Sequence, residues 1–216
     1  MQTLTEIALK ADLGGRVFDD RQVARLLSGT AQRRYNLVNR AIHDGELVRL
    51  VRGEYLVHPE VSGARPHAFT VAQAIRPGSF VSFESALAWR DCIPESVRVH
   101  DCVVPGGRKA EFSVPLYGDF RFIPVAVRRG QALAGVTRHA LAGGIAFIAL
   151  PVRALLDVFF VRRLPADHLE KFLCGLRLSD ECLGQITPEE VSRFRDVYRY
   201  RRMQKLIDGL TRLVAP

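Results

Sequence analysis

A run of polar side chains between Thr30 and His43 has the spacing of one helix face. At about 100° per residue, the apolar residues of this stretch share one arc and the polar residues fill the opposite arc. The expected inner arc contains Tyr35, Leu37, Val38, Ala41 and Ile42. The expected outer arc contains Gln32, Arg33, Asn36, Asn39, Arg40 and His43. No Asp or Glu interrupts this stretch, so the outer arc offers hydrogen bonds without negative charge.

Residues of these types can read base edges in the major groove of DNA. Arg bonds guanine bidentately, and Asn and Gln bond adenine in the same way. Thr30 and the free N–H groups of the first helical turn suit a phosphate. Arg34 is expected to be a flanking phosphate contact, and Arg52 to reach the minor groove or the backbone from a hairpin tip. The expected DNA-binding set is therefore Thr30, Gln32, Arg33, Arg34, Asn36, Asn39, Arg40 and Arg52. A purely solvated helix face, or a protein-binding module without DNA, remains an alternative.

Three helices and a hairpin are expected to position these residues. The periodicity predicts helices over residues 2–11, 21–27 and 30–44, with Asp19 or Asp20 capping the second and Thr30 capping the third. Residues 47–51 and 54–57 are β-rich runs joined by Arg52-Gly53, a hairpin signal. This order is that of a winged helix-turn-helix, predicted for residues 1–60.

A second domain is expected over residues 68–216, after a Pro/Gly-rich linker at His58–His67. Helices are predicted at 68–75, at 83–91 with Ser82 as cap, and from Pro151 onward. Three extended runs between Val97 and Val127, with a further strand at 144–150, predict a small, mainly antiparallel sheet. From Pro165 the chain is expected to be helical, including one long helix capped by Thr187. The predicted fold class is α+β.

Composition favours nucleic-acid binding only weakly. The 216 residues carry 31 Lys+Arg against 23 Asp+Glu, a formal net charge of +8. Arginine accounts for 27 of the cations, which suits phosphate contacts but also follows from a GC-rich genome. Residues 1–67 carry 10 basic and 8 acidic side chains, a net charge of only +2. Binding must therefore be argued from local faces.

The chain is expected to be a soluble cytoplasmic protein without a membrane segment. Its start lacks the pattern of a signal peptide, and its longest apolar stretch, residues 140–152, is shorter than the roughly 20 residues of a membrane-spanning helix. The four cysteines make no CxxC pair. We expect ordinary thiols rather than a zinc site or a disulfide scaffold.

No enzyme motif stands out, so no catalysis, cofactor or metal is expected. The chain contains no GxSxG, HExxH, Walker or GxGxxG sequence. Asp101, Glu111 and Asp119 fall on or beside neighbouring strands, where paired carboxylates could hold Mg²⁺ in a nuclease-like enzyme. Cross-strand ion pairing is the favoured explanation, and the metal-dependent nuclease is kept as the alternative.

Three segments resemble the AbiEi family of antitoxins and transcriptional regulators from bacterial type IV toxin–antitoxin systems. They are the wing strand with Arg52, Gly53 and Tyr55, the SxxSAL helix with Ser82 and Ser85–Leu87, and the PxRALLD helix at Pro151–Asp157. The resemblance spans roughly residues 17–161. It implies a cytoplasmic repressor that binds operator repeats of double-stranded DNA upstream of its own operon. It also implies a cognate nucleotidyltransferase-like toxin, encoded nearby, that the C-terminal domain counters.

Overall fold

The computed structural model describes residues 3–94 and 98–215. Its contacts divide the chain into two compact units. The first unit extends to Pro77 and includes Phe112–Gly118 and Ala140–Ala146. The second unit comprises Gly78–Glu111, Asp119–His139 and the chain from Phe147 onward. The fold is mixed α+β, as the sequence predicts.

Three helices open the first unit, and their local caps fix where each begins. They are α1 (Leu4–Lys10), α2 (Asp20–Leu26) and α3 (Ala31–His43). Asp19 caps α2 in a reciprocal capping box, in which its side chain and the side chain of Gln22 each accept the other residue's backbone N–H. The three predicted helices are thereby confirmed, with ends that differ by one or two residues.

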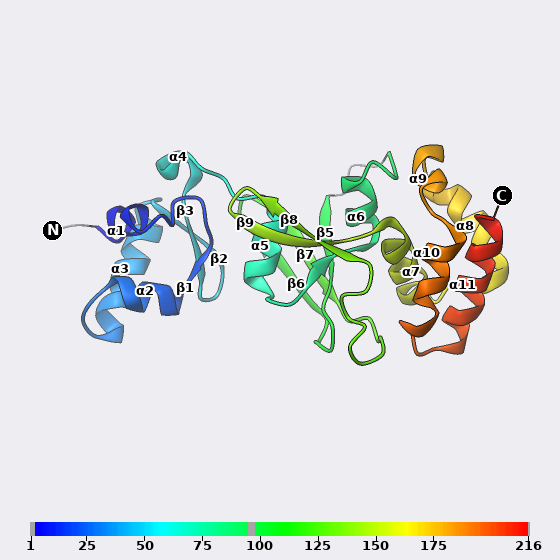
Figure 1. Cartoon of the computed structure of the whole chain (residues 1–216). Helices are drawn as coiled ribbons and strands as arrows, with labels where there is room; N and C mark the ends of the chain where they lie inside the picture. The colour runs from blue at the N-terminus through cyan, green and yellow to red at the C-terminus, as the bar shows by residue number, and fades with distance from the viewer. Residues whose placement is uncertain (1–2, 95–97, 216) are drawn as a thin grey trace. The chain divides into compact units, whose positions relative to one another are not determined.

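A three-stranded antiparallel sheet completes this part of the chain (Figure 1). Strand β3 (Glu54–Val57) lies between β1 (Phe18–Asp19) and β2 (Leu47–Val51). Gly53, at a φ of 84°, makes the turn between β2 and β3, in a backbone region that favours glycine. The predicted hairpin is confirmed.

The helices and this sheet share one apolar core. Its buried members are Leu4, Ala8, Phe18, Val23, Leu27, Val38, Ala41, Leu47, Tyr55 and Val57. The following segment, expected to be the linker between two domains, contains the short helix α4 (Pro59–Ser62), with Pro59 at its first position and Gly63 in the left-handed region behind it. This helix was not anticipated from the sequence.

Helix α5 (Ala68–Ile75), strand β4 (Phe80–Val81) and helix α6 (Phe83–Trp89) follow, as predicted. Ser82 stands at the N-cap of α6 but makes no capping hydrogen bond. Its hydroxyl donates instead to the buried carboxylate of Asp157, at 2.7 Å. The expected capping role of Ser82 was therefore wrong, because the side chain serves a tertiary contact.

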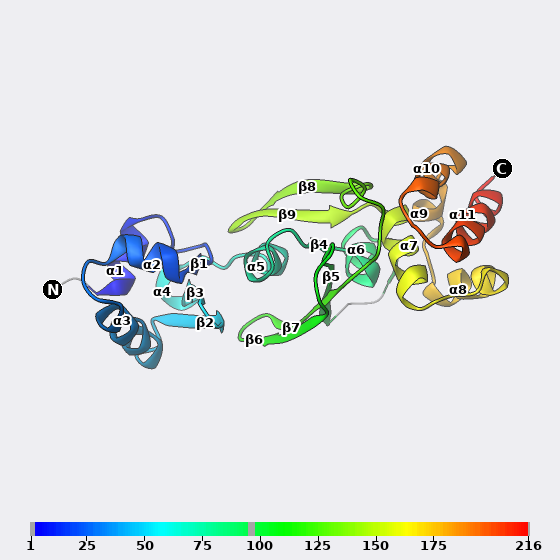
Figure 2. The ribbon, with the colours of Figure 1, turned by 90° about the horizontal axis from the view of Figure 1, so that it is seen from below.

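A six-stranded sheet contains the remaining strands, in the order β6-β7-β5-β4-β9-β8 (Figure 2). They are β5 (Val99–Val103), β6 (Ala110–Val114), β7 (Gly118–Ile123), β8 (Val136–Leu141) and β9 (Gly144–Ala149). Strand β4 pairs antiparallel with β5, but β4 with β9 and β5 with β7 are parallel pairs. The sequence anticipated neither β8 nor these parallel pairings. Val97, the first residue of the predicted extended runs, lies outside the described residues.

Helix α7 (Pro151–Val161) is buried along most of its length and holds an ionic network. The guanidinium of Arg153 donates to Asp157 at 2.9 Å, and both side chains are inaccessible to solvent. Tyr198 donates its hydroxyl to the same carboxylate at 2.8 Å. Burial, and then the charge of Asp157, raises the pKa of Tyr198, so this phenol remains protonated.

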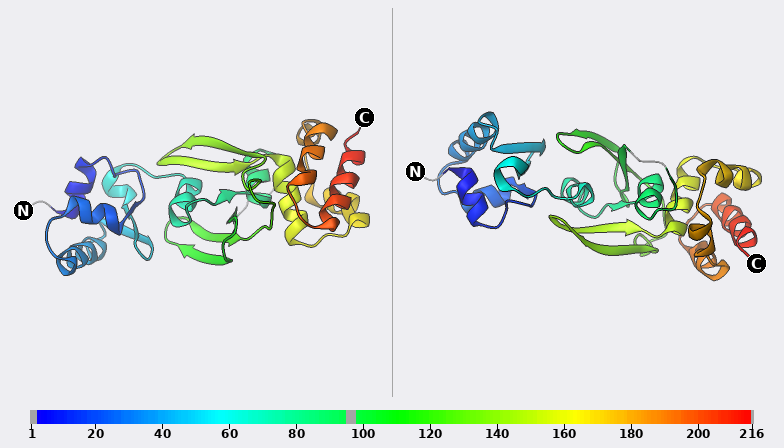
Figure 3. Two further views of the ribbon diagram at one scale, coloured as in Figure 1. Left: turned by 60° about the horizontal axis from the view of Figure 1, so that its bottom comes forward. Right: turned by 90° about the horizontal axis from the view of Figure 1, so that it is seen from above.

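The C-terminal segments are short helices grouped beyond α7 (Figure 3). They are η1 (Ala166–His168), α8 (Leu169–Leu176), α9 (Asp180–Gly184), α10 (Pro188–Ser192), η2 (Arg193–Asp196) and α11 (Arg201–Leu213). The long helix predicted from Thr187 was wrong, because the chain leaves helical geometry around Tyr198. At this point Tyr198 forms a bridge with Val127 and reaches Asp157.

A disulfide between Cys92 and Cys182 joins the segment that follows α6 to α9, across 90 residues of sequence. The expectation that all four cysteines are thiols was therefore wrong, because tertiary packing brings this distant pair together. Cys102 is a buried thiol and Cys174 an exposed one. Within residues 3–94 and 98–215, no helix has both the length and the apolar character to cross a membrane.

Candidate nucleic-acid interface

The outer face of α3 presents most of its polar side chains to solvent. Arg33, Arg40 and His43 are exposed, as are Gln32 and Asn36. Gln32 donates to Asn36 one helical turn later, at 3.0 Å. The two amides lie side by side, and each keeps donors and acceptors for further hydrogen bonds, because an amide carries two donors and two acceptor lone pairs.

The start of α3 is fixed by Thr30, whose hydroxyl accepts the backbone N–H of Arg33 at 3.3 Å. The first turn contains no acidic residue, so the positive end of the helix dipole is not neutralised there. Arg34 donates to the backbone oxygen of Gly29 at 2.5 Å, which places its guanidinium beside the turn between α2 and α3. The predicted cap is confirmed, and the first turn has the charge that favours an anion.

The inner arc of α3 differs from the prediction at its N-terminal end. Val38 and Ala41 are buried, and Leu37 is partly buried against the core. Tyr35 is 60% exposed, so its placement on the inward arc was wrong. The reason is that no residue of α3 before Val38 is buried, so the first turns of the helix project beyond the core.

The exposed ring of Tyr35 borders a concave surface between α2, α3 and the β2–β3 hairpin. This surface encloses a pocket of about 700 Å³. Arg34, Arg49 and Arg52 line the same surface. Arg49 donates to the side chain of Asn39 at 2.9 Å, which links strand β2 to α3. Sequence reasoning selected Arg34, Asn39 and Arg52 but missed Arg49 and Tyr35. Alternation gave no signal for Arg49, because a period of two would place it on the same face as the buried Leu47. The β2–β3 register is irregular between Arg49 and Val51, and the sequence does not reveal this.

Carboxylates lie close to this surface and modify its charge. Asp20 accepts the hydroxyl of Tyr55 at 2.9 Å, and this burial and contact raise the pKa of Tyr55. Glu54 lies directly opposite Asp19 in the β1–β3 pair. Burial, and then the charges of Asp19 and Asp20, raises the pKa of Glu54 to about 7. Glu54 is therefore partly protonated near neutral pH, which reduces the negative charge beside the hairpin.

Two of the three carboxylates considered for a nuclease-like metal site, Asp101 and Glu111, have cationic partners. Asp101 stands opposite Arg121 in the β5–β7 pair and receives two hydrogen bonds from it, each of 2.6 Å. Glu111 pairs with Lys109 at 2.8 Å. The predicted cross-strand ion pairing is confirmed for Asp101. Across the described ranges, no cluster of three or more His, Cys, Asp or Glu side chains has an arrangement that could hold a metal ion.

No protein-family model matches this chain, and a search of curated proteins returned no significant match. The residues of α3 and the adjoining hairpin are therefore the features of this chain that indicate a function.

Proposed function

We propose that the N-terminal helices and three-stranded sheet form a winged helix-turn-helix that binds double-stranded DNA with sequence preference. In this arrangement α3 is the recognition helix in the major groove, and the β2–β3 turn is the wing. The order of helices and strands supports the proposal, as does the position of Arg52 at the exposed turn.

The acid-free outer face of α3 carries the proposal. Its exposed Arg33, Asn36 and Arg40 recur at intervals of three and four residues, so they project from one side of the helix. A face that is merely solvated tends to mix both charge signs. A face that reads DNA tends to be poor in carboxylates, because these repel the phosphates on both sides of the groove.

The remaining residues have positioning roles in this proposal. Thr30 and the first-turn N–H groups of α3 would face a phosphate, with Arg34 beside them. Arg49 and Arg52 would contact the backbone flanking the bases read by α3. Asn39 accepts a hydrogen bond from Arg49, so we assign it to orienting that arginine as well as to the groove.

Titration of randomised duplexes, followed by measurement of affinity for the selected sequence, tests the proposal directly. The triple variant Arg33→Ala, Asn36→Ala and Arg40→Ala should lose most of its preference for the selected duplex over a scrambled one. Each arginine replaced should cost roughly 1 to 3 kcal/mol of binding free energy, since a bidentate base contact is worth about this much.

The matched control removes two positive charges elsewhere, through Arg129→Ala and Arg138→Ala, both at exposed positions. This control should retain the sequence preference and lose at most a modest share of nonspecific affinity. Equal preference in the wild type and a folded triple variant would refute the proposal. Absence of any salt-sensitive retention on DNA would instead favour the protein-interaction module.

The AbiEi-like segments extend this proposal to regulation. On that resemblance the protein would repress its own operon, and its C-terminal domain would counter a nucleotidyltransferase-like toxin encoded by a neighbouring gene. Co-expression with such a neighbour tests this part: the full chain should restore growth, and the triple α3 variant should restore it equally. Toxicity that the full chain fails to relieve would refute the toxin partnership while leaving DNA binding untouched.

A further inference from the structure

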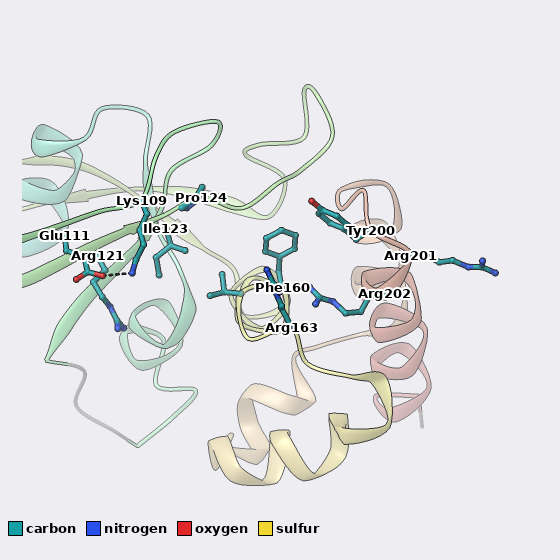
Figure 4. Close-up of a pocket in the computed structure, with 11 residues that line it drawn as sticks. Lys109, Glu111, Arg121, Ile123, Pro124, Phe160, Arg163, Tyr200, Arg201 and Arg202 are labelled. Atoms are coloured by element: carbon teal, nitrogen blue, oxygen red, sulfur yellow. Dashed lines mark hydrogen bonds and ion pairs between the residues drawn. The ribbon is translucent and has the colours of Figure 1, made fainter.

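A cavity of about 800 Å³ lies within the second unit, lined by the ends of several elements. One wall comes from β6 and β7 with the residues beside them, and the other from the end of α7 and the start of α11 (Figure 4). Its volume is in the range of small-molecule sites in proteins. The cavity belongs to neither α3 nor the hairpin and needs a separate explanation.

The cavity is cationic, and its two walls differ in how their charges are balanced. On the strand wall, Lys109 pairs with Glu111 at 2.8 Å, and Arg121 pairs with Asp101 at 2.6 Å. On the helix wall, Arg163 and Arg202 have no carboxylate partner among the residues that the structure describes. The unbalanced positive charge therefore lies on the helix wall.

Arg202 lies in the first turn of α11, which contains no acidic residue. Positive side chains are unfavourable there, because the helix dipole already makes this end positive. One terminal nitrogen of Arg202 donates to the backbone oxygen of Phe160 at 3.0 Å. Its Nε is buried and finds no hydrogen-bond acceptor in the described part of the chain. A buried donor without a partner is costly. Because this Nε is out of contact with solvent, an anion in the cavity would meet the other terminal nitrogen of Arg202 rather than the Nε.

Apolar surface lies beside these cations. Tyr200 is 54% exposed and Val161 is 39% exposed, and both line the cavity. The rings of Phe160 and Tyr200 have centroids 5.7 Å apart and are inclined by 51°, so they form an open angle rather than a closed stack. Figure 4 shows both rings on the same side of the cavity as Arg163 and Arg202. A flat apolar group would cover this exposed surface.

We propose that this cavity binds a nucleotide. Its phosphate would lie between Arg163 and Arg202, where it accepts from their terminal guanidinium nitrogens, and its base would contact the rings of Phe160 and Tyr200. An inorganic anion would leave the exposed rings uncovered, and an uncharged aromatic molecule would leave the guanidinium groups unbalanced. A nucleotide satisfies both at once.

Calorimetric titration of the full chain with AMP, adenosine and inorganic phosphate tests this inference. AMP should bind one per chain, and more tightly than either adenosine or phosphate. Arg202→Met and Arg163→Asn should each weaken AMP at least ~10-fold, because each removes a charge-assisted hydrogen bond. Asparagine is chosen at position 163 because the backbone there has a φ of 52°, a conformation that Asn tolerates.

Tyr200→Ser separates the two halves of the site. It should weaken AMP about 5-fold or more while leaving the affinity for phosphate unchanged, because stacking on the base is lost and the cations remain. Lys205→Ala is the matched control, since Lys205 is an exposed cation of the same helix, α11, and does not line the cavity. This variant removes one positive charge from α11 and should bind AMP within about twofold of the wild type.

Three results would overturn the inference. The first is no AMP binding at millimolar concentration. The second is AMP affinity equal to that of phosphate. The third is a loss in Lys205→Ala as large as in Arg202→Met, which would indicate nonspecific attraction to a basic surface. The triple α3 variant should bind AMP normally, so failure of the DNA proposal does not affect this test.

Discussion

The two cation-rich regions of this molecule present their charges in different ways. On α3 the arginines stand on an exposed helix face among amides, with no carboxylate on the helix. At the second-unit cavity, the strand-borne cations are already paired and the helix-borne ones are not. The first arrangement suits an extended polyanion that covers many side chains. The second suits a small anion that enters the cavity and balances the charge of the unpaired arginines. The pairing of individual charged groups, rather than net charge, therefore distinguishes the two regions.

The largest expected effect concerns the scaffold of the cavity. Asp157→Ala should lower the free energy of unfolding by roughly 3 to 5 kcal/mol, because Arg153 would remain as a buried charge without its partner. Denaturant unfolding measures this loss. Asp119→Ala, at an exposed strand position, is the control and should change stability by less than about 0.5 kcal/mol. Equal stability of the two variants would contradict the assigned role of the network.

The disulfide should give the next largest effect. Cys182→Ser removes a link that closes a loop of 90 residues, and should cost roughly 2 to 4 kcal/mol. Thermal unfolding with and without reductant measures this loss of stability. The unfolding temperature of the variant should be the same with and without reductant. Cys174→Ser removes an exposed thiol and should behave like the wild type. DNA affinity unchanged by reductant would sharpen the contrast between the regions, because no cysteine lies in α3 or the hairpin.

A smaller effect is expected at the wing. Arg52→Ala should weaken all duplexes about equally and reduce the slope of log affinity against log salt by about 1, because one phosphate contact is lost. Fluorescence anisotropy at several salt concentrations gives both quantities. Lys10→Ala removes a charge that does not line the concave surface and should leave the slope unchanged. A sequence-selective loss in Arg52→Ala would instead assign the wing a base contact.

The smallest expected effect is a pH dependence at Glu54. The folded chain holds this proton more tightly than the unfolded chain, so stability falls as pH rises from 4.5 to about 7. Glu54→Gln removes that dependence. Its unfolding temperature relative to the wild type should therefore increase across this window and level off above it. Glu60→Gln, at an exposed site, should show no such trend. A constant difference at all pH values would contradict the raised pKa.

Sequence reasoning succeeded where local chemistry decides the outcome. The cap at Asp19, the helix start at Thr30 and the turn at Gly53 each depend on residues within a few positions of one another. It failed where a side chain exchanges a local role for a distant one. The hydroxyl of Ser82 donates to Asp157 instead of capping α6. Tyr198 donates to the same carboxylate from a point where the predicted helix is interrupted.

The sequence alone determined the order of the N-terminal helices and strands, the caps at Asp19 and Thr30 and the acid-free face of α3, because periodicity and capping act over one or two turns. Tertiary structure alone decided that Tyr35 is exposed, that Arg49 joins α3, and that Cys92 meets Cys182. It also decided that Arg163 and Arg202 face a cavity. Packing brings together residues far apart along the chain, and it leaves some polar atoms buried without partners. The proposed nucleotide site depends on the first effect, because packing brings Arg163 and Arg202 to one wall of the same cavity.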